Sequence, residues 1–138
     1  MKVIVSACLL GENCKYNGGN NRCQKVIDFV KDHEVIPVCP EQMGGLSTPR
    51  LPAEISNGKV MNAEGVSVDA EFRKGAEAAL EIALEKGATH AILQPRSPSC
   101  GGKQVYNGTF SKSLIPGKGV FAQMLADHGI ELLEPNDL

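Results

Sequence analysis

Lys2-Val-Ile-Val-Ser-Ala7 is a short apolar run of the kind that forms a buried β-strand, and Cys8 follows it directly. Two further apolar runs also lead into a cysteine: Glu34-Val-Ile-Pro-Val38 before Cys39, and His90-Ala-Ile-Leu-Gln94 before Cys100. The carboxyl ends of parallel strands in an α/β sheet open onto one crevice. The sequence therefore predicts that three thiols reach one place, and it favours a soft-metal or iron–sulfur site there.

The segments around these runs predict the remaining elements. Helical spacing of apolar residues covers residues 21–32, 70–86 and 118–128, and Gly87 is placed to end the second of these helices. Asn57-Gly58 predicts a hairpin between residues 53–56 and 59–61, Asn107-Gly108 predicts another turn, and residues 130–133 predict a last strand. This order predicts one α/β domain over residues 1–138, a three-layer Rossmann-like domain with a mainly parallel sheet and a small β-hairpin insertion.

Composition narrows the class of protein. With 138 residues and 42% apolar content the chain can build one core without cross-links, so its five cysteines are expected to be reduced. The net charge of −2 and the scattered basic residues predict no nucleic-acid partner and no membrane partner. We see no secretory leader pattern at the amino terminus and expect a cytoplasmic protein, a monomer or a weak homodimer.

Three cysteine-bearing segments carry the candidate chemistry. Cys8 begins a long polar loop that also holds Cys14, although a cysteine at a strand end is often simply buried. Cys39-Pro40-Glu41 places a possible general base beside a thiol, although an isolated glutamate is more often a surface residue. Arg96-Ser-Pro-Ser-Cys-Gly-Gly102 offers hydroxyls, one thiol and free amides, which suit an anion or a cluster sulfide better than an ordinary turn.

The spacing of the cysteines discriminates between metal centres. Structural zinc sites and ferredoxin clusters use ligand pairs close in sequence, and the chain has no such pair. Isolated cysteines at strand ends instead suggest a cluster held by the tertiary fold, with one iron left open as a Lewis acid. Cys14 could replace one of the three or act as a thiol on the substrate side, whereas Cys23 fits a core position. The histidines, which fit ordinary structural positions, are His33, His90 and His128.

Three motifs in the same order resemble the DUF523 family, which includes thiouracil desulfurases: Ser6-Ala-Cys-Leu-Leu-Gly11 with Cys14, Pro37-Val-Cys-Pro-Glu41 with Gly44-Gly-Leu46 and Thr48-Pro-Arg50, and Ser97-Pro-Ser-Cys-Gly101. The resemblance runs on to Gly117-Lys-Gly-Val120 and so covers nearly the whole chain. It implies a [4Fe–4S] cluster whose open iron takes sulfur from a thiolated pyrimidine, with ligands Cys8, Cys39 and Cys100. Glu41 and Ser97 would assist catalysis, and Arg50, Ser99 and Gly101 are expected to contact the substrate.

The leading hypothesis is therefore a cluster-dependent desulfidase that acts on a small thiolated heterocycle such as thiouracil. The open iron would bind the substrate sulfur, Glu41 would activate water, and Ser97 would orient the substrate or relay a proton. The main alternative is a non-catalytic iron–sulfur or metal-binding module, or a sulfur carrier, which needs the cysteines but neither Glu41 nor Ser97. A thiol hydrolase that uses Cys100 lacks a histidine nearby in sequence.

Overall fold

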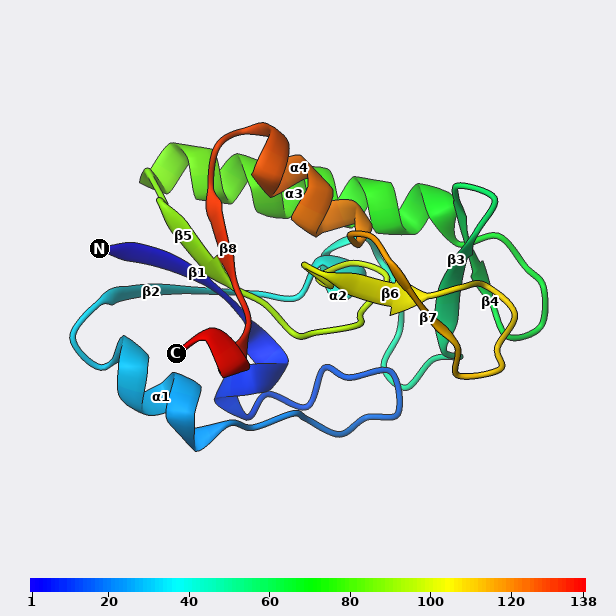
Figure 1. Ribbon diagram of the computed structural model, residues 1–138, viewed down its shortest axis with the longest axis horizontal. Helices are drawn as coiled ribbons and strands as arrows, with labels where there is room; N and C mark the ends of the chain where they lie inside the picture. Colours follow the sequence, from blue (N-terminus) through cyan, green and yellow to red (C-terminus); the bar gives the residue numbers. More distant parts are fainter.

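The computed structural model describes all 138 residues and places a four-stranded sheet at the centre of the molecule (Figure 1). Neighbouring strands lie in the order β2-β1-β5-β8, and every pair is parallel. The strands are β1 (Lys2–Ser6), β2 (Glu34–Val38), β5 (His90–Ile92) and β8 (Glu131–Leu133). The predicted parallel sheet is thereby confirmed, with the opening apolar run as one of its two central strands.

Side chains of β1 alternate between two apolar layers. Val3 and Val5 pack with α1 (Gln24–Val30) on one face, whereas Ile4 packs with α3 (Asp69–Lys86) and α4 (Val120–Asp127) on the other. All three of these β1 side chains are fully buried. Because helices cover both faces, β1 is apolar at every one of these positions, and the molecule has the expected three layers (Figure 1).

The order of the strands locates the crevice. The chain leaves β1 toward β2 on one side and later enters β5 on the other side of β1. Such a reversal opens a crevice outside the carboxyl ends of the strands, where α/β proteins commonly bind ligands. The segments that follow β1, β2 and β5 therefore converge there.

Helix boundaries match the prediction closely at α3, whereas α1 and α4 are shorter than the predicted ranges 21–32 and 118–128. The clear helical pattern of α3 is confirmed, and Gly87 ends that helix in the left-handed conformation with φ +71°. α1 begins at Gln24 rather than residue 21, because the preceding residues bond elsewhere. The N–H groups of Asn21 and Cys23 donate to the carbonyl oxygens of Cys8 and Leu9, which keeps them in the loop that carries Cys8.

Two antiparallel hairpins extend from the carboxyl end of the sheet (Figure 1). The predicted hairpin consists of β3 (Ala53–Ser56) and β4 (Lys59–Asn62). A second hairpin, of β6 (Gln104–Tyr106) and β7 (Leu114–Pro116), was anticipated only as a turn at Asn107-Gly108. β3 and β6 are in contact, so the two hairpins lie side by side.

Three one-turn helices have too few residues to show a periodic pattern. These are η1 (Ala7–Leu10), α2 (Pro40–Met43) and η2 (Pro135–Asp137). α2 packs directly on α3, where Gly44 faces the carbonyl of Glu71 and Gly75 faces the carbonyl of Pro40. None of the helices has both the length and the apolar character needed to traverse a lipid bilayer.

Candidate active site

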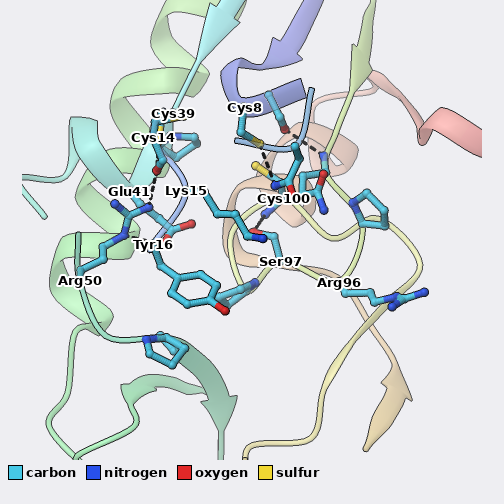
Figure 2. A pocket seen from close by; sticks show the side chains of 18 of the residues that line it. Cys8, Cys14, Lys15, Tyr16, Cys39, Glu41, Arg50, Arg96, Ser97 and Cys100 are labelled. Atoms are coloured by element: carbon cyan, nitrogen blue, oxygen red, sulfur yellow. Dashed lines mark hydrogen bonds and ion pairs between the residues drawn. The ribbon is translucent and has the colours of Figure 1, made fainter. Parts of the chain in front are cut away.

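A cavity of about 490 Å³ opens at the carboxyl ends of β1, β2 and β5 (Figure 2). This volume lies within the range of about 300–1,000 Å³ that is usual for small-molecule sites. Its lining includes four of the five cysteines: Cys8, Cys14, Cys39 and Cys100. The fifth, Cys23, packs against the apolar layer below the sheet, as expected, and does not line the cavity.

Cys8 lies in η1, directly after β1. Its carbonyl oxygen accepts hydrogen bonds from the N–H groups of Gly11 and Asn21, which close the loop around it. The side-chain amide of Asn21 also donates to Cys8 Sγ at 3.5 Å. The adjacent Cys14 thiol lowers the pKa of Cys8 to about 7, against the opposing effect of burial. The thiolate that binds soft metals is therefore readily formed here.

Cys39 occupies the N-cap position of α2, directly after β2. Its Sγ lies 3.8 Å from the carbonyl oxygen of Cys14. The Cys14 thiol lowers the pKa of Cys39 to about 7, and the backbone N–H of Gln42 in the first turn of α2 contributes in the same direction. Cys39 and Cys8 are thus the two thiols whose charged forms the protein favours.

Cys100 is held from beneath by Ser97. Ser97 Oγ accepts hydrogen bonds from the backbone N–H groups of Ser99 (3.1 Å) and Cys100 (3.0 Å). Burial raises the pKa of the Cys100 thiol to about 12, although Ser6 acts in the opposite direction. A buried thiol of this kind loses its proton when a bound metal supplies positive charge.

The start of α4 fixes the same loop from the other side. The N–H groups of Val120 and Phe121 donate to the carbonyl oxygens of Pro98 and Ser99 at 2.8 and 2.9 Å. A Cβ atom at Gly119 would lie 2.5 Å from the Ser99 carbonyl oxygen, so this close approach requires glycine. The loop that carries Cys100 is therefore clamped between β5 and α4.

Cys14 lies with the other thiols rather than away from them. It is 4% exposed, and its pKa is raised, first by the neighbouring thiols of Cys39 and Cys8 and then by burial. Its thiol thus keeps its proton and stabilises the two adjacent thiolates. This arrangement brings into the site a cysteine whose place the sequence left open.

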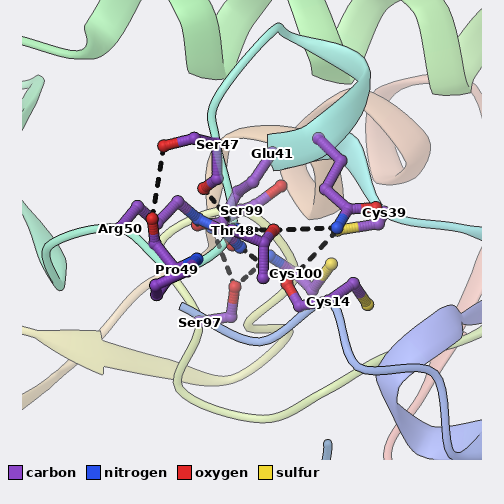
Figure 3. A network of polar contacts seen from close by, with 11 residues as sticks. Cys14, Cys39, Glu41, Ser47, Thr48, Pro49, Arg50, Ser97, Ser99 and Cys100 are labelled. Carbon is purple, nitrogen blue, oxygen red and sulfur yellow. Dashed lines mark hydrogen bonds and ion pairs between the residues drawn. The ribbon is translucent and has the colours of Figure 1, made fainter. Parts of the chain in front are cut away.

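Glu41 and Arg50 form an ion pair at the wall of the cavity (Figure 3). Arg50 Nε donates to Glu41 Oε1 at 3.2 Å, and the side chains are 8% exposed for Arg50 and 21% for Glu41. Burial raises the pKa of Glu41, while Arg50 pulls it in the opposite direction. A partly desolvated carboxyl group with a raised pKa has the properties of a general base.

Most N–H groups of the Arg50 side chain already donate hydrogen bonds within the protein. Besides Glu41, the guanidinium donates to the carbonyl oxygens of Ser47 and Cys14 and to Thr48 Oγ1. Arg50 therefore ties the loop of Cys14 to the turn after α2 and orients Glu41. This gives Arg50 a positioning role in addition to its place in the lining of the cavity.

Ser97 lines the cavity, but Ser99 and Gly101 lie behind its wall. Ser99 is fully buried, and its Oγ has no hydrogen-bond partner. A Cβ atom at Gly101 would lie 2.8 Å from the carbonyl oxygens of Ser97 and Gln104, so Gly101 permits tight packing of the loop. These positions argue against the expected substrate contacts of Ser99 and Gly101.

Several lining residues were not identified from the sequence. Tyr16, Tyr106 and Phe110 supply aromatic surface, and Glu54 adds a second carboxyl group. Glu54 belongs to the predicted hairpin, where nothing in the pattern separates a solvent-facing glutamate from one that faces a cavity. The three histidines lie elsewhere, as expected, and contact Met1, Glu131 and the carbonyl of Met124.

The thiols surround a space rather than a single point. No three cysteine, histidine or acidic side chains converge closely enough to hold one metal ion. Thiol sulfur is nevertheless the donor that soft iron–sulfur centres use, and four thiols face this cavity. The donor set and the spacing fit a group larger than one ion.

Comparison with known proteins gives consistent matches over the full chain. The family model described as 2-thiouracil desulfurase matches residues 3–137. A Bacillus subtilis (strain 168) protein described as "Uncharacterized protein YbbK" is 39% identical over 146 aligned residues, covering 99% of this chain and 97% of the relative. A solved structure named "[4Fe-4S]-dependent thiouracil desulfidase TudS" is 40% identical, with a TM-score of 0.94 over 99% of this chain and 92% of the other.

Proposed function

Because the chain belongs to the 2-thiouracil desulfurase family, we propose that it removes the sulfur atom from a thiolated pyrimidine base such as thiouracil, with a [4Fe–4S] cluster as its cofactor. One observation carries this proposal: thiols from the ends of three parallel strands and a partly buried carboxyl group line the same cavity. The cavity is of a size for a small heterocycle beside a cofactor.

Cys8, Cys39 and Cys100 are the residues that we assign as cluster ligands. They follow β1, β2 and β5, and each is fixed by backbone hydrogen bonds of its own segment. When bound, such a cluster supplies an iron without a protein ligand, a Lewis acid toward sulfur. Cys14 then acts as a neutral thiol beside Cys8 and Cys39 and stabilises their charged forms.

Glu41 is the general base in this proposal. Its carboxyl group lies at the cavity wall, and Arg50 fixes its orientation through Oε1. Oε2 accepts no hydrogen bond from the protein, which leaves it for a water molecule. The water, once deprotonated by Glu41, attacks the ring carbon that bears the sulfur.

Ser97 is the proton donor or orienting group. Both of its hydrogen bonds to Ser99 and Cys100 use Oγ as acceptor, so the hydroxyl proton remains available to the cavity. Over the reaction a C–O bond forms, the C–S bond breaks, and sulfur leaves as hydrosulfide with the electron pair of that bond. No external electron donor is needed for this hydrolysis.

Substitution Glu41→Gln tests the proposal. In anaerobically reconstituted protein we expect unchanged iron content and a fall in sulfide release from 2- or 4-thiouracil of about 100-fold or more, as for loss of a general base. Glu77→Gln, on the exposed face of α3, is the matched control and should keep full turnover. Unchanged turnover in Glu41→Gln would remove the proposed base, and iron-loaded wild type that releases no sulfide would favour a non-catalytic cluster module.

A further inference from the structure

Glu54 is a buried carboxyl group that forms no ion pair. It is 9% exposed, and none of the ion pairs of the protein includes it. Its Oε1 accepts hydrogen bonds from the backbone N–H groups of Gly108 and Phe110 at 3.0 and 3.1 Å. Burying a carboxyl group costs free energy, so a residue kept in such a place needs compensating contacts.

The second oxygen of Glu54 has no partner within the protein. Oε2 accepts no hydrogen bond from the protein, and it is not enclosed, since the one enclosed side-chain atom without a partner is Ser99 Oγ. Glu54 itself is part of the cavity lining. An acceptor in this position suits a ligand with an N–H or O–H group.

The first oxygen of Glu54 positions another part of the cavity wall. The turn that it holds connects β6 to β7 and contains two non-glycine residues in the left-handed region, Phe110 (φ +57°) and Lys112 (φ +60°). This conformation is costly for such residues and persists only where the surroundings impose it. Phe110 and Lys112 both line the cavity, so Glu54 sets the position of this wall.

The aromatic residues indicate the shape of the ligand. Tyr16 and Phe110 are the aromatic side chains that are more than one-third exposed, at 40% and 38%, and both line the cavity. Figure 2 shows the Tyr16 ring at this cavity, near Lys15. Exposed aromatic surface beside a hydrogen-bond acceptor suits a planar heterocycle that carries a ring N–H.

We propose that Glu54 determines substrate specificity by accepting, through Oε2, a hydrogen bond from the ring N–H next to the thiocarbonyl group. The substrate class is then cyclic thioamides that retain this N–H, as both 2- and 4-thiouracil do at N3. This assignment rests on the proposed function and adds to it a residue that no sequence pattern indicates. A 4-thiouracil ring alkylated at N3 has no hydrogen left to donate beside its thiocarbonyl group and is rejected.

Rapid-mixing measurement of binding to the anaerobic holoprotein, completed before sulfide is released, tests this assignment with 4-thiouracil and its N3-methyl derivative. Wild type should bind the unsubstituted base about 10- to 100-fold more tightly, as expected for a hydrogen bond to a charged acceptor. In Glu54→Gln the amide oxygen can still hold the turn, while its NH₂ group replaces the free acceptor. We expect this variant to bind 4-thiouracil about 10-fold or more weakly and to lose the discrimination.

The matched control is Glu64→Gln, which changes an exposed residue after β4. This variant should bind both ligands as wild type does. Equal binding of the two ligands by wild type would overturn the assignment without any variant, so a Glu54→Gln protein that fails to fold does not prevent the test. Unchanged affinity in a folded Glu54→Gln protein would also overturn it. Discrimination by wild type without release of sulfide from any thiolated base would instead reject the proposed function and leave the role of Glu54 standing.

Discussion

The four thiols at the cavity differ in how far their surroundings favour the charged form. The pKa values of Cys8 and Cys39 are lowered to about 7, whereas burial raises that of Cys100 to about 12. Cys14 keeps its proton because it lies beside the two more acidic thiols. These differences assign separate roles to residues of one chemical type.

Serine substitutions distinguish the proposed ligands from the other thiols. We expect little iron in each of the three ligand variants after anaerobic reconstitution: Cys8→Ser, Cys39→Ser and Cys100→Ser. Their loss of metal affinity should exceed the roughly 10-fold loss that is typical when a residue contacting only the ligands is changed. Cys14→Ser should retain iron, because its hydroxyl can replace the neutral donor. Cys23→Ser is the control outside the cavity. If Cys14→Ser loses its iron and one of the three ligand variants keeps it, then Cys14 is the ligand in place of the cysteine changed in that variant.

Arg50 controls the protonation of the proposed base. Its guanidinium lowers the pKa of Glu41 against the raising effect of burial. In Arg50→Gln the pKa of Glu41 should therefore rise, and Glu41 should stay protonated and inactive up to a higher pH. The measurement is the pH dependence of kcat, whose acidic limb should move to higher pH than in wild type. An unmoved acidic limb in a folded, iron-loaded variant would show that Glu41 does not set it.

At the level of single residues, the sequence identified site residues whose chemical type alone indicates a function. The cysteines at strand ends and Glu41 beside Cys39 were found in this way, and all of them line the cavity. Glu54 was missed because its role depends on the turn at Gly108 and Phe110, about 55 residues away in sequence. Ser99 looked like a substrate contact in the motif, but its side chain points into the protein interior.

Among the elements, α2 depends on an unusually close contact with α3. A Cβ atom at Gly75 would overlap the carbonyl oxygen of Pro40, so no larger residue fits there without moving α2. α2 carries Glu41 and begins at Cys39. The spacing between these two helices therefore sets the position of the proposed base and of one thiol.

Gly75→Ala should separate α2 from α3. Overpacking of this kind typically costs about 1–3 kcal/mol, which urea unfolding of the metal-free protein would measure. Iron binding and desulfuration should decline as well, because Cys39 and Glu41 move with α2. Lys74→Ala, on the exposed side of the same helix, is the control and should leave the free energy of unfolding nearly unchanged. A Gly75→Ala protein as stable and active as wild type would contradict this account of the contact.

Long or strongly patterned elements were predictable, and short ones were not. α3 and the β3–β4 hairpin were predicted to within one residue, because helical spacing and the Asn57-Gly58 turn are local signals. η1 and α2 have four residues each, too few for any period to appear. The β6–β7 hairpin was only partly anticipated, because seven residues separate its strands and its turn is held by Glu54.

For the whole molecule, the decisive feature is the position of β1 between β2 and β5. This order brings the ends of three strands to one crevice and places Cys8, Cys39 and Cys100 around it (Figure 2). The sequence predicts parallel strands from their apolar runs, but strand order depends on how all the helices pack. From the sequence alone, the convergence of the cysteines could only be expected. The fold confirms that they line one cavity.

The iron and acid-labile sulfide content of the anaerobically purified wild-type protein tests the central claim most directly. A [4Fe–4S] cluster predicts about four irons and about four sulfides per chain, and a brown protein. Zinc alone in a colourless protein, or iron without labile sulfide, would contradict a cluster held by Cys8, Cys39 and Cys100.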